Sequence, residues 1–274
     1  MIGSLANISF SLVVYNHSYE LISQLVQTAL NFKQTHTFFI IDNSPKDKLS
    51  LSLPVHDKLV YVFNGDNLGY GKAHNLAIKK ILNQTQYHLV LNPDIIFEVS
   101  ALNEMLEFLD SHPNIGLLMP KVLYGNGEIQ YLCKLFPTPF DLIMRRFIPN
   151  FLKNKLQARL NQYELKHKNY GAQMEVPNLS GCFMLLRVEV LKIVGLFDEQ
   201  FFMYLEDTDL SRRINMQFQT MYFPQVSIIH QYEKGSYKNL KLLKYHIVSA
   251  FRYFNKYGWF FDTVRTTINK RLVS

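Results

Sequence analysis

Short apolar runs alternate with amphipathic stretches over the first 120 residues of the chain. The continuous apolar runs predict buried strands at residues 8–15, 37–42, 58–63, 87–91 and 115–119. Apolar residues recur at helical spacing between these runs, which predicts helices at residues 19–32, 69–82 and 102–109. Alternating strands and helices predict an α/β fold with a mostly parallel central sheet flanked by helices. In such a sheet, ligands bind at the carboxyl ends of the strands.

The second half of the chain has a less regular pattern. Residues 122–131 predict a hairpin that turns at Gly125, Asn126 and Gly127. Further along, the pattern predicts a strand at 182–186 and helices at 188–194, 206–216 and 240–257. Residues 136–170 contain Pro, Arg and Lys and match neither period. No linker or repeat divides the chain, so we expect one domain with a helical C-terminal extension.

The composition narrows the class of protein. The chain has 274 residues, 48% of them hydrophobic and 19% charged, which supports a sizeable core and argues against disorder. A net charge of +7 and a pI near 9.2 favour nucleic acid, anionic lipid or phosphorylated substrates as partners. The two cysteines form no disulfide framework or metal motif, which fits a reducing cytoplasm. No apolar run reaches the roughly 18 residues of a membrane span, so any membrane contact is peripheral.

Polar side chains follow four successive predicted strands. Asn16 follows the first strand, Asp42 the second, Asn67 comes shortly after the third, and Asp94 follows the fourth. A single residue of this kind is explained by capping of the next helix. Four in succession favour a ligand site at one edge of the sheet over capping alone.

A glycine-rich segment, Asn67 to Lys72, opens the second predicted helix. Its backbone amides are suited to hold a phosphate, although a plain helix start is an equally good interpretation. The spacing from Gly65 to Gly71 does not match a P-loop, and Ala73 stands where Ser or Thr would bind magnesium. A third glycine of the dinucleotide fingerprint is also missing.

Three acidic or metal-ligating features carry alternative interpretations. Asp94 in Asn92-Pro93-Asp94 is either a cation ligand at a leaving diphosphate or a solvated residue of an Asn-Pro turn. The segment from Glu206 to Asp209 either contains a general base or caps a helix dipole. His230 follows an apolar run and is either a further metal ligand or a structural histidine.

Taken in order, these segments resemble glycosyltransferase family 2, and within it the O-antigen rhamnosyltransferases that act on lipid-linked acceptors. The matching stretches run from Ser11 to about Tyr253: SLVVYNH, FIIDNS, NLGYGKAHNLAI, LVLNPDI, SGCFMLLR, GLFDEQFFMYLEDTDLSRR and the IIH that contains His230. The resemblance implies a GT-A fold, inversion at the anomeric carbon, and dependence on Mg²⁺ or Mn²⁺. It divides the chain into a catalytic domain over 1–235, with a donor half to about 120 and an acceptor half from 121, and an extension over 236–274.

The resemblance also implies a role for each candidate residue. Asp207 is the expected base, Asp94 the expected metal ligand, and His230 a member of the metal or diphosphate shell. The nucleotide-sugar site is expected to include Asn16, Asp42 (at the base or ribose), Asn67, Gly69, Asn92 and Asp94. The family's DxD pattern has an aspartate where this chain has Asn92, which removes one negative charge from the metal site.

The expected reaction is transfer of L-rhamnose from dTDP-rhamnose to a polyprenyl-diphosphate-linked saccharide, in the synthesis of a bacterial surface polysaccharide. A UDP-sugar donor, galactose or an N-acetylhexosamine, is the main alternative. A non-catalytic nucleotide-sugar binder is a distant one, and so is a nucleic-acid-binding protein. We expect no nucleic-acid partner, because the basic residues are spread out and no recognition motif is present.

The predicted helix at 240–257 is amphipathic and basic. Its projected apolar face contains Leu240, Leu243, Ile247, Ala250, Phe251, Phe254 and Tyr257, opposite Lys241, Lys244, Arg252 and Lys256. Trp259, Phe260 and Phe261 follow directly. This pattern predicts a helix that packs on the catalytic domain, lies on an anionic membrane surface, or does both. A membrane-bound acceptor favours a peripheral position on the inner face of the cell membrane.

Overall fold

The structure is a computed structural model that describes residues 7–142, 150–231 and 240–273, and only the backbone of residues 150–155. The strands are β1 Ile8–Val14, β2 Thr35–Asp42, β3 Leu59–Phe63, β4 Tyr87–Leu91, β5 Ile95–Ile96, β6 Ile115–Leu123, β7 Met174–Glu175, β8 Phe183–Arg187 and β9 Gln219–His230. The helices are α1 Tyr19–Asn31, α2 Tyr70–Ile81, α3 Val99–Ser111, α5 Asn150–Tyr163, α6 Val188–Val194, α7 Glu206–Asn215, α8 Leu240–Tyr257 and α9 Thr263–Val273.

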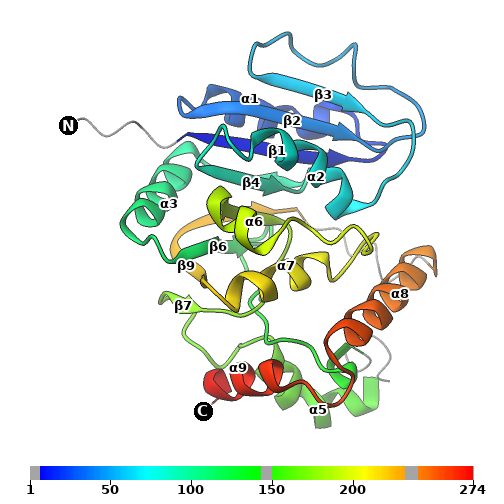
Figure 1. Cartoon of the computed structure of the whole chain (residues 1–274), viewed down its shortest axis with the longest axis vertical. Coiled ribbons are helices and arrows are strands. Elements are labelled where there is room, and N and C mark those ends of the chain that lie inside the picture. Colours follow the sequence, from blue (N-terminus) through cyan, green and yellow to red (C-terminus); the bar gives the residue numbers. More distant parts are fainter. Residues whose placement is uncertain (1–6, 143–149, 232–239, 274) are drawn as a thin grey trace.

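One central sheet runs through the molecule in the order β3-β2-β1-β4-β8-β6-β9-β5, with β7 paired to β9 (Figure 1). The first four strands are parallel, as the alternating pattern predicts. The second half of the sheet is mixed, because β8 lies antiparallel between β4 and β6 while β6 and β9 are parallel. As a result, β8 begins at the edge where the parallel strands end.

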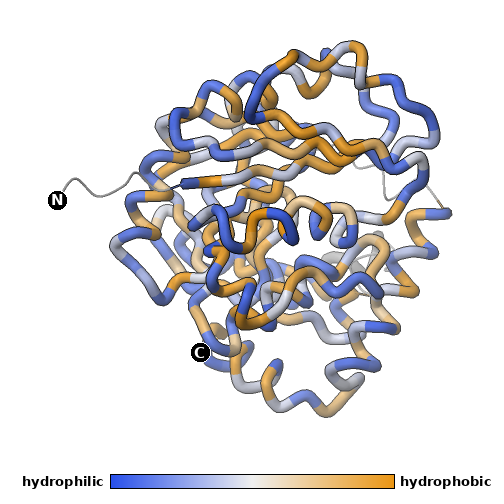
Figure 2. The backbone as a smooth tube through the Cα atoms, turned by 45° about the horizontal axis from the view of Figure 1, so that its top comes forward, coloured by the Kyte–Doolittle hydropathy of each residue, from blue (hydrophilic) through white to orange (hydrophobic). Residues whose placement is uncertain are grey.

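The core consists of the apolar side chains of these strands and of the helix faces that cover them. Figure 2 shows that segments of hydrophobic residues are concentrated along the central strands. Four buried polar side chains in this core form a chain of hydrogen bonds. Ser9 bonds to His88, His88 to Ser11, and Ser11 to His74, at 2.8, 2.8 and 2.6 Å. Burial lowers the pKa of His88 to about 3, so this imidazole is neutral. These hydrogen bonds satisfy the two serine hydroxyls and both ring nitrogens of His88, whereas His74 Nε2 has no partner among the described residues.

Several elements differ from the sequence expectations. Helices α5 and α9 were not predicted, because polar residues dominate both segments and leave little apolar periodicity. Strand β9 is 12 residues long, whereas the sequence pattern indicated only its last apolar run. The predicted hairpin is present in short form. The backbone N–H of Tyr124 donates to the Glu128 carbonyl at 2.8 Å, and Leu123 and Ile129 form an antiparallel bridge.

Helix α8 packs against α7, where Lys256 and Tyr257 both donate to Asp209. Helix α9 lies nearer α5 (Figure 1) and bonds to the Phe136 backbone through Asn269. Tyr253 and Phe254 of α8 are buried in a small apolar cluster with Phe201 and Leu205. Arg212 of α7 makes a buried bidentate pair with Asp262, at 2.6 and 2.7 Å. None of the described helices combines the length and apolarity that a membrane crossing needs. The extension is thus fixed to the helix that carries the predicted base.

The predicted apolar face of α8 divides between two environments. Phe254 packs inward, whereas Leu240, Ile247 and Phe251 are 83%, 40% and 55% exposed. Trp259 is half-buried on the rings of Phe251 and Phe254. Phe260 and Phe261 remain 80% and 95% exposed. Packing on the domain and an exposed apolar surface therefore coexist in this helix.

The buried pair between Arg212 and Asp262 generates a stability prediction. Asp262→Ala leaves the buried guanidinium without its carboxylate, so we expect a loss of about 3–5 kcal/mol in the free energy of unfolding, measured in urea. Lys79→Ala is the matched control, because the Lys79–Glu199 pair is exposed and contributes about 0–1 kcal/mol. Equal losses in the two variants would contradict the structural role of the buried pair.

Candidate active site

A cavity of about 1040 Å³ opens at the carboxyl ends of the parallel strands. This is the position expected for a ligand in an open α/β sheet, and the size suits a nucleotide sugar. Its walls include the β1–α1 connection and α1, the segments that follow β2 to β4, and the start of α8, with further contributions from β5, Met203 and Gln231. The lining includes Tyr15, His17, Asn43, Asn67, Gly69, Tyr70, Asn92, Asp94, Lys241, Leu242 and Tyr245.

Four of the predicted donor-site residues, Asn67, Gly69, Asn92 and Asp94, line this cavity. The Asn67 side chain accepts a hydrogen bond from the Gly69 N–H at 3.0 Å, which shapes the start of α2. Gly69 has φ +85°, and a Cβ there would overlap the carbonyl oxygen of Phe202. Only glycine fits this close approach, so the glycine-rich segment serves backbone packing next to the cavity.

Two other predicted residues lie at the edge of the cavity and are not in its lining. Asn16 is exposed in a left-handed conformation, with φ 57°. Asp42 is buried at the end of β2, where Oδ1 accepts from the Ser44 N–H and Oδ2 from the Tyr61 hydroxyl, each at 2.8 Å. Asn43, the next residue, faces the cavity instead. The roles of Asn16 and Asp42 toward a nucleotide stay predictions.

Asp94 and His230 meet although 136 positions separate them in sequence. The short strand β5 pairs antiparallel with the end of β9, so Ile95 lies opposite His230. The Gln231 N–H donates to the Asp94 carbonyl at 2.9 Å and extends this pairing. The pairing places His230 Nε2 3.3 Å from Asp94 Oδ1.

This pair has the chemistry of a divalent-cation site. Asp94 Oδ1 is buried and has no hydrogen-bond donor among the described residues, which is costly unless a cation or a ligand meets it. Carboxylate oxygen and imidazole nitrogen are both good ligands for Mn²⁺, and the carboxylate suits Mg²⁺. Within the described ranges, no group of three or more His, Cys, Asp or Glu side chains forms a complete cage. The pair therefore fits a cation whose remaining ligands come from a diphosphate and water.

The acidic cluster at the start of α7 separates into three different environments. Asp209 is fully buried and bonded to Arg213, Lys256 and Tyr257, at 2.9, 2.7 and 2.7 Å. Burial, together with the Asp207 charge, raises the pKa of Glu206 well above its usual range, which favours the neutral form of this carboxyl. Asp207 is the remaining carboxylate of the cluster.

Backbone groups hold the Asp207 side chain at the site. Oδ2 accepts from the Gly181 N–H at 2.9 Å, and Oδ1 accepts from the N–H of Thr208 at 2.7 Å. Tyr204 and Leu205, just before α7, have φ of 68° and 65°, a costly left-handed conformation for residues with side chains. Strain of this kind persists where the surrounding structure fixes the backbone, and here it aims the first turn of α7.

Tyr70 lies between the segments that carry Asp94 and Asp207, and the sequence interpretation did not single it out. Its hydroxyl lies 2.6 Å from the Gly181 carbonyl oxygen and 3.0 Å from Asn92 Oδ1. Burial raises the pKa of Tyr70 well above its ordinary value, and the charges of Asp207 and Asp94 add to the effect. Tyr70 therefore stands between the Asp94 side and the Asp207 side of the site.

The sequence interpretation also missed two parts of the cavity wall. His17 lines the cavity, and burial lowers its pKa, although Asp94 and Asp42 partly oppose the shift. The first two turns of α8 contribute Lys241, Leu242 and Tyr245, and Tyr245 stacks on Phe202 with ring centroids 4.4 Å apart. The position of His17 shortly after strand β1 was a usable sequence signal for a residue at the ligand edge. The amphipathic pattern of α8, in contrast, gave no indication that this helix forms a cavity wall.

Comparison with known proteins identifies the family. The family model described as Glycosyl transferase family 2 matches residues 9–195, more than half of the chain. The chain belongs to glycosyl transferase family 2. The chain is therefore a glycosyltransferase, and the matched region contains Tyr70, Asp94 and Gly181. Asp207 and His230 lie beyond the matched region.

The similar sequences include proteins named as rhamnosyltransferases and one named as a hexosyltransferase. The hexosyltransferase, Agl10 of Haloferax volcanii, is 26% identical over 178 residues, which covers 64% of this chain and 52% of its own. The chain is 24% identical to rhamnosyltransferase WbbL of Escherichia coli K12 over 254 residues, which covers 88% of this chain and 91% of that protein. It is 27% identical over 177 residues to N-acetylglucosaminyl-diphospho-decaprenol L-rhamnosyltransferase of Mycobacterium tuberculosis. That match covers 61% of this chain and spans only 56% of the mycobacterial protein.

Solved structures share the GT-A fold. GalNAc-T7 with UDP, GalNAc and Mn²⁺ superposes with a TM-score of 0.65 at 15% identity, over 93% of this chain and 50% of that chain. The mannosyltransferase PcManGT of Pyrobaculum calidifontis, with GDP-Man and Mn²⁺, gives a TM-score of 0.57 at 14% identity, over 91% of this chain and 65% of its own. These likenesses confirm the predicted fold.

Proposed function

We propose that this enzyme transfers L-rhamnose, with inversion, from dTDP-rhamnose to a polyprenyl-diphosphate-linked saccharide. The observation that carries the proposal is the arrangement of Asp94 with His230 on one side of Tyr70 and Asp207 on the other. The names of the similar sequences support rhamnose as the sugar and a lipid-linked saccharide as the acceptor.

In this proposal, the donor diphosphate lies at the Asp94 side of the cavity. Asp94 and His230 would hold Mg²⁺ or Mn²⁺, which supplies positive charge to the leaving diphosphate. Asn67 and Gly69 would line the donor pocket, and Asn92 would stand beside the diphosphate through its contact with Tyr70. Asn16 and Asp42 would contact the nucleotide from the cavity edge.

Asp207 acts as the general base. An acceptor hydroxyl gives its proton to Asp207 as its oxygen forms a bond to the anomeric carbon, and the bond from that carbon to the diphosphate oxygen breaks. Attack from the face opposite the diphosphate inverts the configuration. The two bonds from backbone N–H groups keep Asp207 oriented while its carboxylate retains lone pairs for the proton.

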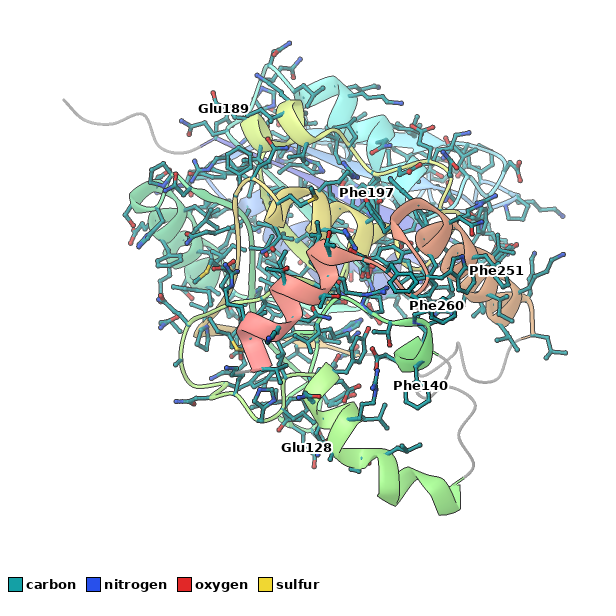
Figure 3. The ribbon with its side chains drawn as sticks, turned by 60° about the horizontal axis from the view of Figure 1, so that its bottom comes forward. Glu128, Phe140, Glu189, Phe197, Phe251 and Phe260 are labelled. Atoms are coloured by element: carbon teal, nitrogen blue, oxygen red, sulfur yellow. The ribbon has the colours of Figure 1, made fainter. Side chains whose placement is uncertain are left out.

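The exposed side of the extension is proposed to meet an anionic membrane surface. Residues 240–274 contain seven Lys and Arg residues and one acidic residue, Asp262, which is buried against Arg212. Figure 3 shows Phe140, Phe251 and Phe260 on the same side of the molecule. Apolar rings beside exposed Lys244 and Arg252 suit an interface in which rings enter the acyl boundary and cations meet headgroups.

The base assignment predicts a selective loss of activity. Asp207→Asn removes basicity and keeps the shape, so kcat should fall about 10²- to 10⁴-fold while donor binding by calorimetry stays near wild type. Glu206→Gln is the matched control, because the amide resembles the protonated carboxyl and should retain most activity. An inactive Glu206→Gln with an active Asp207→Asn would reverse the assignment.

A donor screen tests the proposed reaction. With Mg²⁺ or Mn²⁺, we expect turnover of dTDP-rhamnose in a panel that also contains UDP-galactose and a UDP-N-acetylhexosamine, measured by release of nucleotide diphosphate. EDTA and Asp94→Ala should each abolish it, because the leaving diphosphate loses its charge partner. Turnover of a UDP-sugar alone would refute the rhamnosyl donor, and full activity in EDTA would refute the metal role.

Liposome binding tests the proposed membrane surface. Replacing Phe251, Phe260 and Phe261 with Ser should weaken binding to anionic liposomes at low salt roughly tenfold or more, since each buried Phe contributes about 1.5–3 kcal/mol. Raised salt should weaken wild-type binding as well. The matched control replaces Leu51 and Val55, which are 100% and 105% exposed in the β2–β3 connection, with Ser. Equal effects of the two sets, or no wild-type binding, would exclude this surface.

A further inference from the structure

The side-chain amide of Gln130 lies against the histidine of the proposed metal site. Gln130 comes directly after the short hairpin, is only 3% exposed, and contacts His230 twice. Its Nε2 donates to the His230 carbonyl oxygen at 2.7 Å, and its Oε1 lies 3.0 Å from His230 Nδ1. Nε2 also donates to the Leu123 carbonyl oxygen at 3.3 Å. One buried amide thus meets both the backbone and the ring of the same residue.

These contacts fix which way the amide points. The carbonyl oxygens of Leu123 and His230 can only accept, so the NH₂ group of Gln130 must face them. The amide oxygen then faces His230 Nδ1 and can only accept in turn. Nδ1 must therefore carry the hydrogen. In a neutral imidazole this leaves the lone pair on Nε2, the nitrogen that lies 3.3 Å from Asp94 Oδ1.

We infer that Gln130 is a positioning residue for the metal site. It holds His230 in the Nδ1–H tautomer and aims the Nε2 lone pair to the point where Asp94 Oδ1 also points. Metal-binding histidines generally need such a partner, because the bond to the second nitrogen sets both the tautomer and the ring orientation. The inference rests on the proposed function, since it assumes a divalent cation beside Asp94.

The structural role of this segment can be separated from the positioning role. The Gln130 backbone N–H donates to the Val122 carbonyl at 2.8 Å, and the Gln130 carbonyl accepts from the Leu132 N–H at 2.9 Å. Both bonds hold the hairpin and survive a change of side chain. Gln130→Met keeps the length and burial of the side chain and removes only the amide.

The tautomer is measurable without metal, donor or turnover. The chain has nine histidines, and His230→Gln identifies the His230 signals in ¹⁵N spectra of the histidine rings of the metal-free protein. We expect the ¹⁵N shifts of wild-type His230 to report a protonated Nδ1 and an unprotonated Nε2, and Gln130→Met to give a mixture of the two tautomers. A wild-type His230 with the hydrogen on Nε2 would overturn the inference, and this measurement requires no Gln130 variant to fold.

Metal affinity provides the second readout. In the presence of dTDP or UDP, Gln130→Met should bind Mn²⁺ about 10- to 100-fold more weakly than wild type, measured by electron paramagnetic resonance titration. Thr220→Val is the matched control: it removes a buried hydrogen bond to the Val176 carbonyl from the same strand, β9, and should leave Mn²⁺ affinity unchanged. Unchanged affinity in folded Gln130→Met would overturn the inference.

A double-mutant cycle separates positioning from general damage. If Gln130 acts through His230, then Gln130→Met should have no further effect on Mn²⁺ affinity in a His230→Ala background. Additive losses would overturn the inference. Absence of Mn²⁺ binding by the wild type with either nucleotide would instead refute the metal site of the proposed function, and the tautomer measurement would still decide what Gln130 does.

Discussion

The site depends on the backbone of one residue, Gly181. Its N–H donates to Asp207 at 2.9 Å, and its carbonyl lies 2.6 Å from the Tyr70 hydroxyl. The carbonyl of the next residue, Cys182, accepts from the Asn92 N–H at 3.0 Å. A Cβ on Gly181 would lie 3.3 Å from Asp207 Cβ, which is closer than most van der Waals contacts, and 3.5 Å from the Tyr70 ring, which is an ordinary contact distance. The two halves of the chain meet at this residue, next to the Asp94 and Asp207 segments, because β8 runs antiparallel to β4 and begins at the ligand edge.

The extension is as much a part of this site as the sheet is. Helix α8 presents Lys241 and Tyr245 to the cavity, packs Tyr253 and Phe254 on the loop before α7, and leaves Phe251 exposed. The buried pair of Arg212 with Asp262 fixes the following turn to α7 itself. Any displacement of α8 therefore changes both the cavity wall and the position of α7, the helix that carries Asp207. A contact on the exposed side of α8 would therefore be transmitted to the cavity wall and to α7 through the same packing.

The sequence alone predicts the parts of this arrangement that follow from local periodicity. Buried strands and the polar residues at their ends indicate the ligand edge, because each signal lies within a few residues of the strand that produces it. The meeting of Asp94 with His230 depends on the pairing of β5 with β9, and no local pattern encodes that pairing; the family resemblance alone suggested it. The wall formed by Lys241 and Tyr245 escaped prediction for the same reason, since the packing of α8 on the cavity is a tertiary contact.

The scarcity of protein ligands gives the His230 tautomer its importance. Where the family's DxD pattern supplies a first aspartate, this chain has Asn92, whose neutral amide contacts the Tyr70 hydroxyl. Asp94 is then the one carboxylate at the end of β4, and the described residues offer no third side chain to complete a cage around it. A divalent cation prefers about six oxygen or nitrogen ligands, so in the proposed metal site diphosphate and water would supply most of them. When the protein supplies so few ligands, the loss of one of them would remove a large share of what the protein contributes to cation binding. In the proposed metal site, a histidine held with its lone pair aimed at the cation would offset the missing carboxylate without adding a second negative charge beside the leaving diphosphate.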